Sequence, residues 1–231
     1  AYMNTNLAIY EKDMSVQAVC GYSYPFRWME DNSNLVKVNT YYTAWGYATW
    51  REKEEEMYRD ITMHNFDRIM RRPLQMHRLY RASCNQFCNF VKGMLEYIPV
   101  LVQHDEIVKL DMAFSVYIFM NHKYVIFPKM SKTRNIGYNG TGMNCEKIQI
   151  DSNKPVSSRN YDYAAQPIDE CKGFEAVGAQ NLPFYEENNR RLNKFYPVAI
   201  RERLRTITAY IAYLILGRKR AKRLLQFGQK A

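Results

Sequence analysis

The chain has 231 residues, enough for a sizeable hydrophobic core in one large domain or two small ones. Its formal net charge is +10, but the residues from position 188 onward carry twelve Lys and Arg against one acid, so residues 1–187 sum to about −1. This asymmetry excludes a nucleic-acid groove across the whole protein. The five cysteines are scattered and odd in number; they predict no disulfide framework or zinc site, and a reducing cytoplasm fits them best.

The amino-terminal part of the chain predicts one helix and one strand. Apolar residues recur at helical spacing over residues 1–14, and the apolar segment Val16–Cys20 predicts a strand that stops at Gly21. Residues 21–40 combine a proline with an Asn/Asp/Ser cluster, and we expect an irregular, mobile loop there.

Helices are expected to dominate the middle of the chain. The charged segment 51–59 predicts a solvated helix, and residues 60–97 predict further helix with a break at their proline. Residues 98–110 are ambiguous. Asp111 is placed to be the N-cap of a helix over residues 112–121, because a side-chain oxygen there can accept a backbone N–H of the first turn.

A buried strand and a glycine-rich loop follow that helix. Tyr124–Phe127 is a short apolar run, and Pro128 ends it because proline cannot donate to a β-ladder. Dense glycines after it let the backbone approach a bulky polar ligand, so the loop suits an anionic or heavily hydroxylated small molecule. An ordinary surface loop is the alternative. The residues concerned are Lys132, Arg134, Asn135, Gly137, Gly140 and Gly142.

The carboxyl-terminal third divides into a polar part and a basic part. Residues 146–196 are polar and contain three prolines, so we expect a long extended excursion. Residues 197–231 predict a basic amphipathic helix whose apolar stretch, about ten residues, is too short to span a bilayer. Such a helix is typical of a segment that lies on anionic lipid. A helix packed on its own domain, or an oligomer contact, is the alternative.

An aromatic segment precedes the charged helix. Trp45, Tyr47 and Trp50 lie within six residues around Gly46. Aromatic faces with a polar edge stack on sugar rings, so this segment could form a platform for a saccharide. The alternative is that one or two of the three rings anchor the core.

Four segments, taken in chain order, carry a family resemblance. They are Gly21–Pro25, the Trp-Gly-aromatic-Ala-Thr-Trp box Trp45–Trp50, the aromatic-rich segment Asp111–Phe119 and the Pro-Lys/Asn-Gly string Phe127–Gly142. This order resembles the C-terminal half of bacterial GT-A-type glycosyltransferases of family 2, the sugar transferases of capsule and O-antigen assembly. The likeness covers roughly residues 1–145.

The resemblance implies an α/β fold, the C-terminal part of a GT-A domain with a few strands flanked by helices. Residues 1–145 would be its acceptor-side half. Such enzymes begin with a Rossmann-like half that binds the nucleotide-sugar donor and ends in an acidic motif for a divalent metal, Mn²⁺ or Mg²⁺. The sequence starts just after the position of that motif, so most of the donor and metal sites are expected outside this chain.

The resemblance also implies roles for individual residues. Asp111 matches the Asp that opens the corresponding helix, and it is the first candidate for the base that takes the acceptor proton. A plain N-cap is the alternative role. Asp105 and Glu106 form a fallback pair. Substrate contacts are assigned to Trp45, Gly46, Tyr47 and Trp50 and to the loop residues named above.

One position departs from the family pattern. Relatives commonly carry a His near the end of the glycine-rich loop that helps to hold the metal or the phosphates. Asn144 stands there in this chain, and an amide oxygen is a poorer ligand for a transition metal than imidazole. Lys132 and Arg134 could still contact a diphosphate, with solvated surface charges as the alternative.

These features predict a glycosyltransferase that moves a sugar from a nucleotide-sugar donor to a growing, lipid-linked glycan. They place it in the cytoplasm, peripheral on the inner face of the cytoplasmic membrane, with no nucleic-acid partner. The rival hypothesis is a non-catalytic module that binds a membrane surface or a saccharide.

Overall fold

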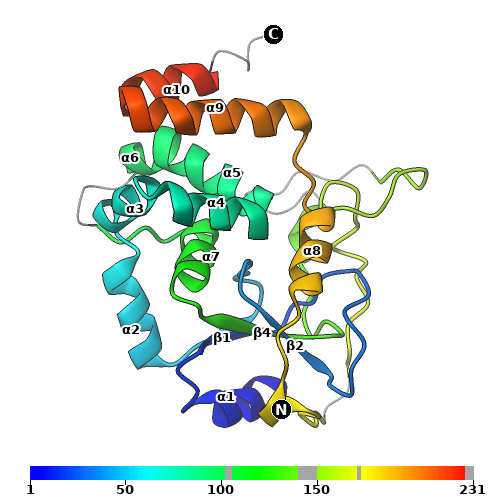
Figure 1. Ribbon diagram of the computed structural model, residues 1–231. Helices are drawn as coiled ribbons and strands as arrows, with labels where there is room; N and C mark the ends of the chain where they lie inside the picture. The colour runs from blue at the N-terminus through cyan, green and yellow to red at the C-terminus, as the bar shows by residue number, and fades with distance from the viewer. Residues whose placement is uncertain (102–105, 140–149, 171–172, 227–231) are drawn as a thin grey trace.

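The computed structural model describes residues 1–101, 106–139, 150–170 and 173–226 (Figure 1). Its centre is a mixed four-stranded sheet with the order β2-β4-β1-β3. The two central strands run parallel, and each outer strand is antiparallel to its neighbour. The strands are β1 (Val16–Cys20), β2 (Leu35–Val38), β3 (Tyr47–Ala48) and β4 (Tyr124–Pro128). The predicted strands at β1 and β4 are confirmed, and the fold is α/β with a small sheet flanked by helices.

The prediction of an irregular loop over residues 21–40 is wrong for its last part. Leu35–Val38 forms an edge strand, in which Val36 lies opposite Phe127 and Val38 opposite Val125 of β4. Its Leu-Val-Lys-Val sequence is rich in β-branched residues, which favour a pleated and half-buried surface. Three of the four side chains are buried, so packing against β4 outweighs the polar neighbourhood of this segment.

The two faces of the sheet are buried in two separate clusters. Leu35 and Ile126 lie in the cluster on the side of α1 (Tyr2–Tyr10). Val36 and Phe127 lie in the larger cluster, toward the helices on the opposite side. Side chains alternate across a strand, so neighbouring residues of β2 and β4 serve different cores.

A layer of short helices covers the side of the sheet opposite α1 (Figure 1). The predicted helical character of residues 60–97 is confirmed, and Pro73 begins a helix, where its missing N–H costs nothing. Ser83 separates the next two helices, and its side-chain oxygen accepts a hydrogen bond from the Gln86 N–H. The helices are α2 (Arg51–Asp60), α3 (Met63–Met70), α4 (Pro73–Ala82), α5 (Cys84–Lys92), the π-helical turn Gly93–Tyr97, α6 (Ile98–Leu101) and α7 (Asp111–Met120).

Residues 146–196 include a helix that the polar composition did not predict. The helix α8 (Glu186–Phe195) has two acidic residues in its first turn and Lys194 in its last, which suits the helix dipole. The described residues of this segment before α8 are irregular apart from the 3₁₀ turn Ala179–Asn181 and a single parallel bridge between Phe184 and Lys37. They nevertheless pack on the domain, because Tyr163 is buried and the Gln166 Nε2 donates to the Ser23 carbonyl at 2.6 Å.

The expected basic helix at the carboxyl end is a pair of helices. Gly217, with φ of +79°, separates α9 (Ile200–Leu216) from α10 (Arg218–Gln226), and the two pack on each other at the top of Figure 1. Among the described helices, none combines the length and the apolar character needed to cross a bilayer.

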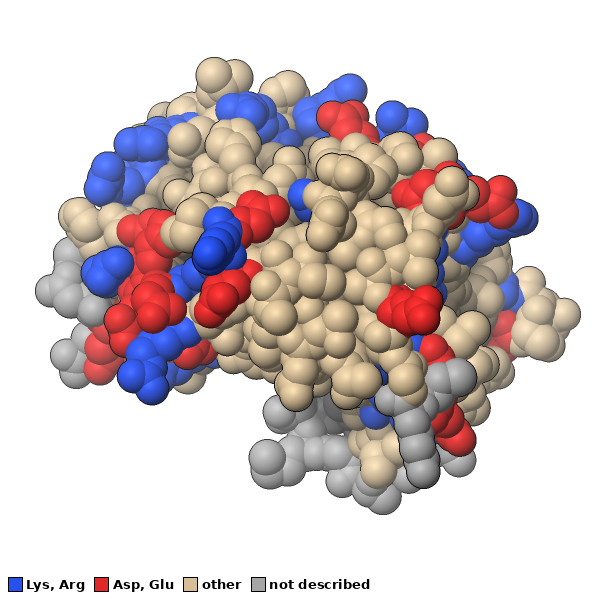
Figure 2. Space-filling model, turned by 90° about the horizontal axis from the view of Figure 1, so that it is seen from below, with Lys and Arg blue, Asp and Glu red and all other residues tan. Residues whose placement is uncertain are grey.

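The face that carries α1 has an uncharged centre. Figure 2 looks at the molecule from below, and uncharged residues fill the centre of that view while acidic and basic side chains lie around it. The nine residues of α1 include no charged side chain. The Lys and Arg residues of the carboxyl-terminal part lie mainly in another place, on α9 and α10.

Candidate functional site

Two loops far apart in the sequence meet at the end of β1. The Gly21 N–H donates to the Gly46 carbonyl at 2.6 Å, and the Lys132 N–H donates to the Gly21 carbonyl at 2.7 Å. The Thr133 hydroxyl donates to the Trp45 carbonyl at 3.4 Å. The aromatic segment and the start of the loop after β4 are thus held side by side by backbone bonds.

The helix α7 brings Asp111 to the same place. The Ser115 hydroxyl accepts the Tyr42 N–H at 3.0 Å and donates to the Asp111 carbonyl at 2.9 Å. A backbone hydrogen bond from Ala44 reaches the Asp111 carboxyl group. Asp111 therefore lies beside the aromatic segment.

The environment of Asp111 favours its protonated form. The residue has an exposed surface, but the protein around its carboxyl group removes enough water to raise the pKa, and the hydrogen bond from Ala44 offsets this only in part. A carboxylate with a raised pKa is a stronger proton acceptor than an ordinary one. This is the property expected of a general base.

Asp111 is not the N-cap of its helix, so that prediction is wrong. Leu110 occupies the N-cap position without a side-chain hydrogen bond, and Asp111 is the first helical residue. Its carboxyl group bonds to Ala44 of another loop instead. The tertiary contact thus replaces the local one that the sequence favours.

Trp45 and Tyr47 are half-buried and keep part of their rings open. The Trp45 ring meets Tyr22 edge to face at 4.8 Å and Tyr163 at 5.4 Å. The Tyr47 ring meets Tyr42 at 5.1 Å. Both rings are therefore held in fixed orientations by other aromatic rings, which suits a platform for a sugar ring.

Trp50 lies apart from the other two aromatics. It precedes α2 and packs against the smaller core cluster on the α1 side of the sheet, whereas Trp45 and Tyr47 pack against the larger one. The Lys53 Nζ lies 3.7 Å from the centre of the Trp50 ring. The placement of Trp50 matches the alternative role of a core anchor.

The cations of the loop after β4 have acidic neighbours. Lys132 forms an ion pair with Asp169, and its Nζ lies 4.9 Å from the centre of the Phe174 ring. Arg134 lies 3.9 Å from Glu170 and is exposed. A diphosphate would therefore have to compete with Asp169 for Lys132, while Arg134 is the more accessible of the two cations.

The rest of the loop is described only in part. The Asn135 side-chain oxygen accepts the Gly137 N–H at 3.0 Å, at the start of the 3₁₀ turn Ile136–Asn139. The predicted contacts at Gly140 and Gly142, and the metal position at Asn144, lie outside the described residues.

Of the two fallback carboxylates, only Glu106 is described. Asp105 lies outside the described residues. Glu106 is exposed, next to the bridge between Ile107 and Thr62 that ties this segment to the end of α2. Within the described ranges, no group of three or more His, Cys, Asp or Glu residues could hold a metal ion.

Tyr163 is the contribution to this cluster that the sequence did not reveal. It comes from the polar segment that follows the glycine-rich loop in the chain, more than a hundred residues after Trp45. Only one indication of an aromatic cluster in this segment was visible in the sequence, the close spacing of Tyr161 and Tyr163. The pairing itself depends on the tertiary fold.

Replacing Gly46 with alanine tests how tightly the two loops fit. Gly46 has φ of +64°, and an added Cβ would lie 2.8 Å from the Thr133 Cγ2. We expect Gly46→Ala to lower the free energy of unfolding by about 2 kcal/mol, from backbone strain and from overpacking. Chemical denaturation measures this loss.

Two controls separate the strain from the clash. Gly173→Ala has neither feature, because its φ lies outside the left-handed range and an added Cβ meets no atom within 4 Å, so it should change the free energy of unfolding by less than about 1 kcal/mol. Adding Thr133→Ser to Gly46→Ala removes the clashing methyl group and should leave only the cost of the backbone strain, about 1 kcal/mol. Equal losses for Gly46→Ala with and without Thr133→Ser would contradict the close fit.

The fold and this cluster define an α/β protein in which a carboxylate, a pair of aromatic rings and a polar loop converge at the end of a parallel strand pair. Comparison of the chain with protein-family models, curated proteins and solved structures finds no match.

Proposed function

We propose that this chain is the acceptor side of a GT-A-type glycosyltransferase that moves a sugar from a nucleotide-sugar donor to a growing glycan. The observation that carries the proposal is the position of Asp111, whose pKa is raised by burial, beside the half-buried Trp45 and Tyr47. The resemblance of four segments to family 2 transferases supports the same function. A carboxylate beside fixed aromatic rings suits deprotonation of a sugar hydroxyl.

The proposed chemistry assigns one task to each side chain. An acceptor sugar packs against Trp45 or Tyr47, which orients one hydroxyl toward Asp111. The Asp111 carboxylate takes the proton of that hydroxyl as its oxygen forms a bond to the anomeric carbon of the donor sugar. The bond from the anomeric carbon to the phosphate breaks, and the nucleoside diphosphate leaves with that electron pair. Arg134 would contact the departing phosphates.

Acceptor-dependent release of nucleoside diphosphate tests this function. The protein expressed from its complete coding region is incubated with a panel of nucleotide sugars, with and without lipid-linked saccharides. We expect one donor to be consumed faster when an acceptor is present. Binding of saccharide without consumption of any donor would instead favour the non-catalytic module.

The basic end of the chain supports a membrane-surface partner for either function. Lys219, Arg220 and Arg223 of α10 are exposed, and Ile215 at the end of α9 is 75 % exposed. Arg218 is different, because it pairs with Asp67 at 3.1 Å. Exposed cations beside exposed apolar side chains suit the headgroup region of an anionic bilayer.

Neutralising the three exposed cations of α10 tests this partner. Each cation near an anionic surface contributes about 1 kcal/mol, so Lys219→Gln/Arg220→Gln/Arg223→Gln should weaken binding to phosphatidylserine vesicles by about 100-fold. Co-sedimentation measures the binding. Arg51→Gln/Arg59→Gln, which neutralises exposed residues of α2, is the control and should bind as wild type. Equal vesicle binding by the triple variant would exclude this surface.

A further inference from the structure

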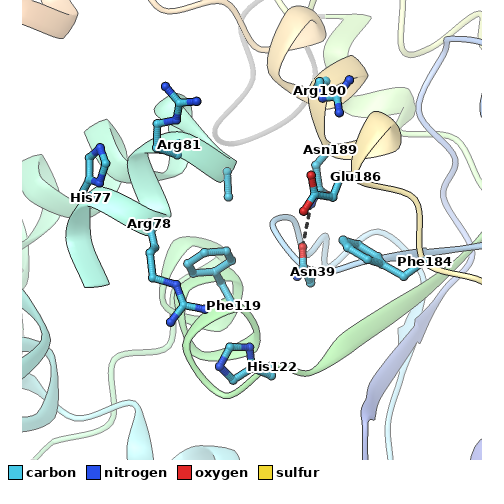
Figure 3. Close-up of a pocket in the computed structure, with 11 residues that line it drawn as sticks. Asn39, His77, Arg78, Arg81, Phe119, His122, Phe184, Glu186, Asn189 and Arg190 are labelled. Atoms are coloured by element: carbon cyan, nitrogen blue, oxygen red, sulfur yellow. Dashed lines mark hydrogen bonds between the residues drawn. The ribbon is translucent and has the colours of Figure 1, made fainter. Parts of the chain in front are cut away.

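A cavity lies between α4 and α8, apart from the candidate site around Asp111. Its volume is about 640 Å³, and it is lined by Asn39, His77, Arg78, Arg81, Ala82, Phe119, His122, Phe184, Glu186, Asn189 and Arg190. Figure 3 shows α4 and α8 as facing walls, with the end of α7 and the residue after β2 between them. Asp111 and His122 lie at opposite ends of α7, which puts them about 15 Å apart along the helix.

The lining of this cavity is predominantly cationic. Three arginines face one carboxylate, Glu186. Arg190 is paired with Glu187 at 2.8 Å. Arg78 and Arg81 are exposed and form no ion pair with any residue that the structure describes. Figure 3 shows the Arg78 side chain directed toward Phe119 and His122, and the Arg81 side chain directed to the opposite end of this wall. Arg78 is therefore placed to bind an anion beside Phe119 through charge-assisted hydrogen bonds, while Arg81 adds positive charge to the wall.

The base of the cavity is fixed by a buried amide network. The Asn189 Nδ2 donates to the Asn39 Oδ1 at 2.8 Å, and the Asn189 Oδ1 accepts the Thr40 hydroxyl at 2.9 Å. The Asn193 Nδ2 donates to the Ala82 carbonyl at 2.6 Å and so ties the two walls together. The spacing between the α4 arginines and α8 is thus set by the fold and needs no ligand to form.

Two aromatic rings give the cavity an apolar component. Phe119 comes from the end of α7, and Phe184 is held by the Tyr124 ring at 5.2 Å. Arg78, Phe119 and His122 also line a small adjoining hollow together. His122 has φ of +55°, unlike any other non-glycine residue in the described ranges. This conformation ends α7, because the Lys123 N–H then reaches the Ile118 carbonyl at 2.9 Å, and it fixes where His122 lies at the edge of the cavity.

We propose that this cavity binds an acidic sugar, a saccharide ring that carries a phosphate or a carboxylate. The guanidinium group of Arg78 binds the anionic group, and Arg81 adds a second positive charge to the same wall. The ring packs against Phe119 or Phe184. A neutral sugar lacks the charge, and inorganic phosphate lacks the ring, so each fills only half of the site.

Calorimetric titration of the full chain with four probes tests this site. The probes are glucose 1-phosphate, glucuronate, glucose and inorganic phosphate. We expect at least one of the two acidic sugars to bind more tightly than glucose and phosphate, and the preferred one identifies the anionic group. Weaker or equal binding of both acidic sugars relative to inorganic phosphate would overturn the proposal.

Variants on the two walls should shift the affinity in opposite directions. Arg78→Gln/Arg81→Gln should weaken binding of the acidic sugar by about tenfold or more, because it removes the charge-assisted contact of Arg78 and the positive charge of Arg81. Glu186→Gln removes the one negative charge of the lining and should tighten it. A general loss of structure cannot produce both shifts, and circular dichroism checks that each variant is folded.

The control variant matches the charge change at another place. Arg51→Gln/Arg59→Gln also removes two exposed cations, but from α2, and should leave the affinity unchanged. Equal weakening by this control and by Arg78→Gln/Arg81→Gln would show that only the net charge matters, which would also overturn the site. None of these measurements depends on sugar transfer at Asp111.

Discussion

Asp111→Asn is expected to abolish most sugar transfer while leaving the protein folded. A positioned general base contributes about 10²–10⁴-fold to a rate, so kcat should fall by a factor in that range. The amide keeps the shape of the side chain, and Trp45 and Tyr47 remain in place, so KM for the acceptor should change little. Steady-state kinetics on the protein from its complete coding region measure both constants.

The matched control is Asp151→Asn, which changes a half-buried carboxylate that pairs with Lys154 at 3.0 Å in the segment before α8. It should transfer sugar at the wild-type rate. Transfer by Asp111→Asn at a rate near that of the control would exclude Asp111 as the base. Glu106→Gln then becomes the next variant to measure, because Glu106 is the described member of the fallback pair.

The raised pKa of Asp111 gives this prediction a pH dependence. Transfer needs the carboxylate, so the wild-type rate should fall as the pH drops through that pKa. The free energy of unfolding depends on pH in the opposite direction. Between the unfolded and the folded pKa the native state holds the extra proton, so the free energy of unfolding falls as the pH rises through this window. Asp111→Asn should therefore not destabilise the protein at neutral pH, and it should flatten that dependence.

Lys53→Met is expected to cause the largest loss of stability among single changes at polar residues. The Lys53 Nζ is buried and donates to the carbonyls of Tyr10, Asp13 and Val16 at 2.8–3.0 Å. Burial lowers the pKa of Lys53 to about 8, which still leaves the ammonium form dominant at neutral pH. Methionine fills the space but leaves three carbonyls without this donor, which should cost about 3 kcal/mol or more.

Lys123→Met is the matched control for this change. Lys123 is also largely buried, but its Nζ contacts the Glu56 carboxylate at 3.1 Å, and Glu56 is 39 % exposed and can be hydrated instead. The expected cost is about 1 kcal/mol or less. Denaturant unfolding at neutral pH measures both losses. Similar losses for the two variants would contradict the inference that the three hydrogen bonds of Lys53 hold α2 against the turn from α1 to β1.

The regular elements with strong apolar patterns were predictable from the sequence. The runs at β1 and β4 and the helical spacing before and after Pro73 all gave the observed elements. The edge strand β2 was missed because its four residues lie in a polar stretch, where packing against β4 decides the outcome. The helix α8 was missed although its acidic first turn and basic last turn were visible in the sequence.

The candidate site was predictable in its parts and less so in its arrangement. Asp111, Trp45 and Tyr47 were named from the sequence, and the structure places them together. Trp50 belongs to the same sequence motif, yet it lies on the other side of the sheet because the chain turns into α2 at this point. Which face an aromatic side chain reaches is set by the tertiary fold, and the same holds for the approach of Tyr163.

A crystal structure with an acceptor saccharide and a nucleoside diphosphate tests the central claim most directly. The claim is that Asp111 activates an acceptor hydroxyl held by Trp45 or Tyr47. The expected result is an acceptor hydroxyl within about 2.6–3.2 Å of the Asp111 carboxylate, with the sugar ring against one of the two aromatics. An acceptor bound elsewhere, with no hydroxyl near Asp111, would contradict it.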